Sequence, residues 1–145
     1  MYRSHGAAVT LIGHHPERAN LSVLKDVTFV SEENILHEST FNLVIEASGN
    51  LAGLDLALRL VKPRGTIILK STMAGTSVSS LNPMVINEIR ILGSRCGPFK
   101  HAMELLASGT IDPRSIIQAE YPLADGVKAV EAASRPGALK ILLKM

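Results

Sequence analysis

Apolar and polar positions along the chain follow two spacings, one typical of strands and one typical of helices. Short runs rich in valine, isoleucine and leucine predict buried strands at residues 9–12, 27–30, 43–47, 66–70 and 89–92. Between several of these runs, apolar residues recur every three or four positions, which predicts helices with one apolar face. Strands that alternate with helices are typical of an α/β protein with a mainly parallel sheet.

Three helices are expected from the helical spacing, at residues 16–26, 51–61 and 99–107. The second has an apolar face made of Leu51, Leu54, Leu58 and Val61. Pro63 and Gly65 follow directly, and we expect them to end the helix before the strand at residues 66–70. The remaining segments are a polar, loop-like stretch at 31–41 and a single helical turn at 83–87.

The end of the chain has a different pattern, which reads as strand, helix and strand. The apolar positions predict a strand at residues 115–123, a helix at 124–134 and a second strand at 138–144. No internal repeat and no low-complexity segment interrupts the chain.

Composition and charge exclude several classes of function. The 145 residues are 46% hydrophobic and 19% charged, which fits a folded globular protein. The net charge is only +2 and the basic residues are scattered, so we expect neither a nucleic-acid nor a membrane-surface partner. Cys96 is the one cysteine, so no intrachain disulfide can form and a cytoplasmic setting is expected. We expect Cys96 to be a small buried hydrophobe.

Several common catalytic and binding motifs are absent from the sequence. A dinucleotide pyrophosphate is usually held by a G-x-G-x-x-G turn after a strand, and the chain contains no such triplet. Residues 49–53 and 93–97 carry two glycines each, which is typical of ordinary turns. One cysteine and ungrouped histidines give no zinc site, and the adjacent His14 and His15 would point apart on a strand end.

Four stretches taken together resemble the C-terminal half of the zinc-type medium-chain alcohol dehydrogenase family. They are HGAAVTLIGHHPER, FNLVIEASGNLAGLDLALRLVKPRGTIILKST, NEIRILGSRCG and YPLADGVKAVEAASRPGALKILLKM. Their order and spacing match the family over essentially the whole chain.

The resemblance implies an incomplete Rossmann-type doubly wound parallel sheet, of strand order 3-2-1-4-5-6 in the family. Strands 2 to 6 are expected here, without the first strand, its glycine-rich loop or the family's zinc-binding catalytic domain. Residues 1–115 would form a partial dinucleotide-binding domain. Residues 116–145 would form the strand–helix–strand segment that returns to the catalytic domain in the family.

For the adenosine half of the cofactor, the resemblance points to the end of the strand at residues 9–12. Gly13 stands where relatives that prefer NAD carry an acidic residue for the ribose hydroxyls. Its neighbours His14, His15 and Arg18 would instead meet a 2′-phosphate, which favours NADP(H) over NAD(H). The alternative is that these are solvated residues at a helix start.

For the nicotinamide half, the resemblance points to residues at the ends of the later strands, because ligands of open α/β sheets bind there. The candidates are Ser48, Gly49, Lys70, Ser71, Ser94 and Arg95. Lys140 matches a basic residue of the family that contacts the pyrophosphate. Each of these residues has the alternative of being an ordinary solvated loop or strand residue.

Two hypotheses about function follow. The first is the cofactor-binding portion of an NAD(P)-dependent oxidoreductase that shows no activity as this chain alone, with no catalytic residue and no zinc ligand of its own. The second is a non-catalytic remnant or interaction module that keeps the fold without binding a cofactor. Expected partners are a nicotinamide dinucleotide, a second copy of the chain or an upstream catalytic fragment. The sequence does not identify a substrate.

Overall fold

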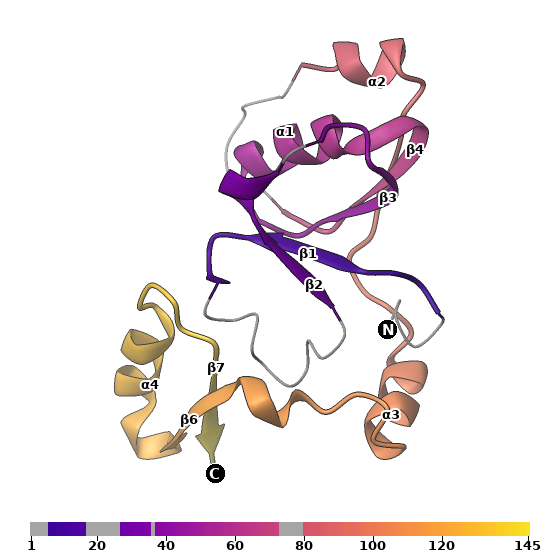
Figure 1. Ribbon diagram of the computed structural model, residues 1–145. Coiled ribbons are helices and arrows are strands. Elements are labelled where there is room, and N and C mark those ends of the chain that lie inside the picture. Colours follow the sequence, from indigo (N-terminus) through magenta and orange to yellow (C-terminus); the bar gives the residue numbers. More distant parts are fainter. Residues whose placement is uncertain (1–5, 17–26, 36, 73–79) are drawn as a thin grey trace. The chain divides into compact units, whose positions relative to one another are not determined.

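The computed structural model describes residues 6–16, 27–35, 37–72 and 80–145 (Figure 1). In chain order, the strands and helices are β1 (Thr10–Gly13), β2 (Thr28–Ser31), β3 (Phe41–Glu46), α1 (Leu51–Leu60), β4 (Val61–Leu69), α2 (Asn82–Ile86), β5 (Arg90–Gly93), α3 (Phe99–Ala107), β6 (Ile117–Pro122), α4 (Gly126–Ala133) and β7 (Lys140–Lys144). Contacts divide the chain into two compact units, one of residues 35–98 and one drawn from residues 1–34 and 99–145.

The unit of residues 35–98 is a three-stranded parallel sheet with α1 packed on it. The strand order is β3-β4-β5, and Val44, Ile67 and Ile91 lie side by side across it. These three side chains pack with apolar residues of α1 in a core around Ala57, Leu58, Val61, Ile67 and Ile89. One face of the sheet is therefore covered by the helix, as an α/β layer requires.

Helix α1 begins where the sequence predicts, because Asn50 caps it. The Asn50 backbone is extended, and its side-chain oxygen accepts a hydrogen bond from the Gly53 N–H at 2.8 Å. This bond satisfies one of the N–H groups that the first turn of a helix leaves without a partner.

The junction between α1 and β4 corrects one expectation. We expected Val61 to be the last residue of the helix's apolar face and residues 62–65 to separate helix from strand. In the structure the helix ends at Leu60, and Val61 is the first residue of β4. Val61 pairs with Phe41, and the register shifts between Phe41 and Leu43. The segment with Pro63 and Gly65 is therefore a bulged start of the strand, in which Arg64 has φ of 63°.

The second unit contains two separate two-stranded parallel pairs. Strand β1 pairs with β2, and β6 pairs with β7. Helix α4 contacts β6 and β7, and its Ala129 is buried. The strand–helix–strand reading of the C-terminal segment is thus confirmed, as is a helix over Phe99–Ala107. The helix expected at residues 16–26 lies outside the described residues apart from Pro16.

All the described strand pairs are parallel, which confirms the α/β class with parallel sheets. The described strands form three sheets, of order β1-β2, β3-β4-β5 and β6-β7. Strands β1 to β5 lie within about two residues of the predicted ones at their ends, except at the start of β4, which begins five residues earlier. The polar stretch at 31–41 contains one 3-10 turn, Glu32–Asn34.

Candidate functional site

The carboxyl ends of β3, β4 and β5 meet at one edge of their sheet. The Lys70 N–H donates to the Glu46 carbonyl at 2.9 Å, and the Ser94 N–H donates to the Leu69 carbonyl at 2.9 Å. These bonds continue the sheet one step past the strands, so the segments that follow the strands start side by side. Parallel α/β sheets bind their ligands at this edge.

Six of the predicted residues lie at this edge, and hydrogen bonds join several of them. The Gly49 N–H donates to the Ser71 Oγ at 2.7 Å, which joins the β3–α1 loop to the end of β4. The Lys70 Nζ lies 3.2 Å from the Arg95 carbonyl and 3.5 Å from the Ser94 Oγ, which joins the ends of β4 and β5. The members are Ser48, Gly49, Lys70, Ser71, Ser94 and Arg95. We call this set the β3–β5 edge cluster; its role in binding stays a prediction.

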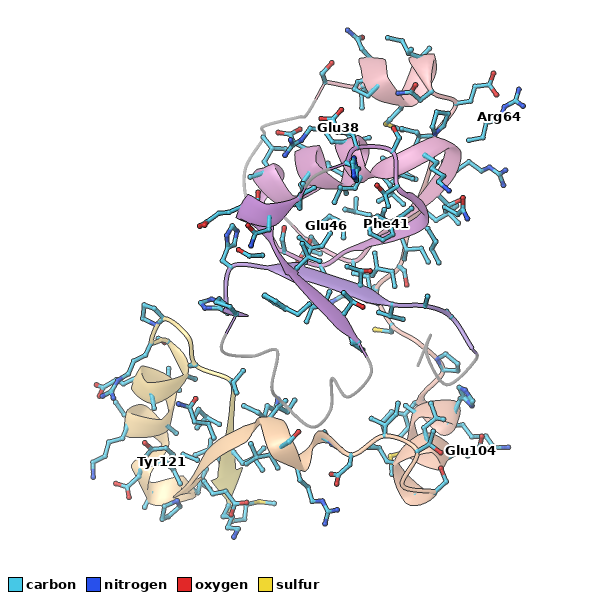
Figure 2. All side chains as sticks on the ribbon, viewed as in Figure 1. Glu38, Phe41, Glu46, Arg64, Glu104 and Tyr121 are labelled. Carbon is cyan, nitrogen blue, oxygen red and sulfur yellow. The ribbon has the colours of Figure 1, made fainter. Side chains whose placement is uncertain are left out.

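Glu46, which sequence reasoning missed, is a buried residue that accepts hydrogen bonds from Ser48 of the cluster. Glu46, which Figure 2 labels, shares a face of β3 with the core residue Val44. It is only 3% exposed. Its Oε1 accepts from the Ser48 N–H at 2.7 Å and from the Ser48 hydroxyl at 2.6 Å. Burial raises the pKa of the Glu46 carboxyl, but hydrogen bonds from Ser48 and Ser71 outweigh it and hold that pKa below its ordinary value of 4.5. The carboxylate is therefore ionised at neutral pH.

The loop from Ser48 to Gly53 is closely packed. Gly49 has φ of +77°, a conformation that favours glycine. A Cβ at Gly53 would lie 1.9 Å from the Ser48 Oγ and 3.1 Å from the Glu46 Oε1, so no side chain fits there. Glycine at position 53 is thus what lets the first turn of α1 approach the serine and the buried carboxylate.

The carboxyl end of the β1–β2 pair carries the other predicted residues. Gly13 is the last residue of β1 and pairs with Ser31 at the end of β2. His14 follows it, and its Nε2 lies 2.8 Å from the Glu32 Oε2. Sequence reasoning missed Glu32, which places a carboxylate beside the histidine predicted to meet a 2′-phosphate. His15 follows His14, and Arg18 lies outside the described residues.

Lys140 and Cys96 are both exposed. Lys140 is the first residue of β7 and is exposed. Cys96 is also exposed, so the expectation that it is a small buried hydrophobe is wrong. It lies in the irregular segment between β5 and α3.

No zinc site can be assembled from the residues that the structure describes. Among them, no group of three or more His, Cys, Asp or Glu side chains could hold a metal ion. The described helices also include none that is long and apolar enough to cross a membrane.

The comparison with protein families identifies the fold. The family described as "Zinc-binding dehydrogenase" matches residues 1–108, which is most of the chain. The chain belongs to the zinc-binding dehydrogenase family. This confirms the resemblance on which the candidate residues were chosen.

Curated relatives match the chain over about a third of their own length, with identities of 26% and 29% within the aligned segment. A 2-dehydro-3-deoxy-L-galactonate 5-dehydrogenase of Pseudoalteromonas atlantica is 29% identical over 107 residues, which are 71% of this chain and 31% of the relative. An L-idonate 5-dehydrogenase (NAD(P)(+)) of Escherichia coli is 26% identical over 106 residues, again 71% and 31%. The chain thus aligns with about a third of the length of these relatives.

Solved structures of similar proteins cover nearly the whole chain. The E. coli L-idonate 5-dehydrogenase has a TM-score of 0.85 at 23% identity, over 96% of this chain and 43% of that one. A putative zinc-binding dehydrogenase of Sinorhizobium meliloti bound to NADP has a TM-score of 0.82 at 20% identity, over 99% and 47%. An alcohol dehydrogenase of Thermus sp. ATN1 has a TM-score of 0.84 at 25% identity, over 99% and 46%. The dehydrogenase-type α/β fold is therefore shown.

Proposed function

We propose that this chain is the cofactor-binding portion of an NAD(P)-dependent, alcohol dehydrogenase-like oxidoreductase. The observation that carries the proposal is the β3–β5 edge cluster, which gathers hydroxyl, amide and cationic groups where parallel sheets bind nucleotides. The names of two similar proteins, one an L-idonate 5-dehydrogenase (NAD(P)(+)) and one a structure bound to NADP, support the same chemistry.

In this proposal the chain's own residues bind and orient the cofactor. When bound, the nicotinamide supplies the hydride chemistry. The β3–β5 edge cluster holds the nicotinamide half, and Gly13 with its neighbours holds the adenosine half. Lys140 contacts the pyrophosphate. Residues 1–115 serve as the dinucleotide-binding part, and residues 116–145 as the segment that packs on a catalytic domain.

A titration with NADPH, followed by nicotinamide fluorescence, tests this proposal. We expect the 145-residue chain to bind NADPH and Lys70→Ala to weaken binding by about tenfold to a hundredfold, because a charge-assisted hydrogen bond contributes roughly 1.5–3 kcal/mol. Lys62→Ala is the matched control, since Lys62 is an exposed lysine in the same strand but far from its carboxyl end. Absence of NADPH binding by the wild-type chain would refute the proposal and favour a module that keeps the fold without a cofactor.

The preferred cofactor in this proposal is NADP(H). A Cβ at Gly13 would meet only Phe29, at an ordinary distance of 3.8 Å, so Gly13→Asp fits without strain. A carboxylate there repels the 2′-phosphate, and we expect the ratio of NADPH to NADH affinity to fall about tenfold. Glu32→Gln should change this ratio in the opposite direction, because it removes the carboxylate beside His14. Affinities for both cofactors measured on each variant check this, and a wild type that prefers NADH contradicts it.

A further inference from the structure

Glu46 is the one charged side chain that is buried among the described residues, and stability alone does not explain it. Burying an ionised carboxylate costs free energy unless both oxygens are paired. Only Oε1 meets that condition, because Oε2 is buried and has no hydrogen-bond partner in the described part of the chain. A residue kept at such a cost is expected to have a role beyond packing.

The contacts of Glu46 show what it controls. Its Oε1 accepts both the N–H and the hydroxyl of Ser48, which restrains the orientation of the serine. The Ser48 Oγ in turn accepts the Asn50 N–H at 3.2 Å, which ties the start of α1 to the same point. Ser71 accepts the Gly49 N–H and also lowers the pKa of the Glu46 carboxyl, so it completes the link to β4.

These bonds fix a short loop that is otherwise exposed. Ser48, Gly49 and Asn50 are all exposed. An exposed loop held by a buried charge is preorganised, and a preorganised loop loses less conformational entropy when a ligand binds.

We propose that Glu46 is a positioning residue, which holds Ser48 and Gly49 in the conformation that receives the nicotinamide half of the cofactor. This inference rests on the proposed function and deepens it. Glu46 itself does not touch the ligand; it acts through Ser48 and Ser71.

The test separates positioning from general stability by using two ligands. NADPH contains both halves of the cofactor, whereas adenosine 2′,5′-bisphosphate contains only the adenosine half. We expect Glu46→Gln to raise the dissociation constant of NADPH about tenfold, because a neutral amide oxygen accepts the two hydrogen bonds from Ser48 more weakly than an ionised carboxylate does. The dissociation constant of adenosine 2′,5′-bisphosphate, measured by calorimetry on the same 145-residue chain, should change less than twofold.

A pair of substitutions at Ser71 keeps the test decisive if Glu46→Gln fails to fold by circular dichroism. Ser71→Ala removes the acceptor of the Gly49 N–H. It should weaken the binding of NADPH but not that of adenosine 2′,5′-bisphosphate. Ser71→Thr keeps a hydroxyl and should restore most of the affinity. The inference would be overturned if Glu46→Gln or Ser71→Ala weakened the binding of both ligands equally. It would also be overturned if neither substitution weakened the binding of NADPH.

The two proposals fail in different ways. A wild-type chain that binds neither NADPH nor adenosine 2′,5′-bisphosphate refutes the proposed function, and the inference fails with it. A wild type that binds both, with variants that bind NADPH equally well, refutes only the role of Glu46.

Discussion

Replacing Gly65 with alanine is expected to lower the free energy of unfolding by about 3 kcal/mol, the upper range for overpacking a filled core. A Cβ at this position would lie 2.6 Å from the Val61 Cγ2, 2.8 Å from the Lys62 carbonyl oxygen and 3.0 Å from the Asn42 carbonyl oxygen. Two of these atoms belong to the backbone of β3 and β4, so they cannot move aside without breaking the sheet. Urea unfolding followed by far-UV circular dichroism measures the loss.

Gly93→Ala is the matched control for this prediction. Gly93 also lies in the three-stranded sheet, as the last residue of β5, but nothing lies within 4 Å of a Cβ built there. We expect its free energy of unfolding to stay within about 0.5 kcal/mol of the wild type. Measurements at one protein concentration keep any association equal between variants. If the Gly65 variant unfolds like the control, the bulged start of β4 is not as closely packed as the structure shows.

The success and the failure of sequence reasoning at this junction have one physical cause. Apolar periodicity identifies which segments are buried, and it gave β3, β5 and the length of α3 well. It also identified Val61 as a buried residue, which it is. Burial alone, however, does not separate the last turn of a helix from the first residue of a strand. The pairing of Val61 with Phe41 decides that, and a contact across twenty residues leaves no local pattern.

The candidate site shows the same limit for polar residues. Residues after strands were found because strand ends are visible in the sequence, and hydrogen bonds join five of them at one edge of the sheet. Glu46 was missed because it lies inside the apolar run of β3, where a charge reads as an exposed strand position. The signal that could have identified it is its place in the alternation: Val44 and Glu46 share a face, and Val44 is a core residue.

Within the unit of residues 35–98, the face of the β3-β4-β5 sheet opposite Val44 carries exposed apolar side chains. Ile45, Ile68 and Leu92 lie side by side across the three strands, on the side opposite Val44. Ile45 is 39% exposed and Leu92 is 55% exposed, although parallel sheets normally bury both faces. Strand β3 is also an edge of its sheet, so its outer backbone groups have no strand partner in that sheet.

We expect the 145-residue chain to self-associate in solution through this edge and face. Unpaired backbone groups cost about 1–3 kcal/mol each when they are kept from water, and a domain has only about 5–15 kcal/mol of net stability. Pairing β3 with a strand of a second copy satisfies these groups and covers Ile45 in one step. Size-exclusion chromatography with light scattering at micromolar concentration should therefore give a mass of at least two chains.

One substitution in each unit tests which unit forms the contact between two copies of the chain. Ile45→Lys puts a charge on the outer strand, which natural edge strands use to prevent pairing, and we expect it to shift the chain toward monomer. Val127→Lys is the control, because Val127 is an apolar residue of α4, 76% exposed, in the other unit. We expect it to leave the mass of the wild type unchanged. A sharp monomer peak for the wild type, with a cooperative thermal transition, would mean that the exposed edge and face are covered within one chain.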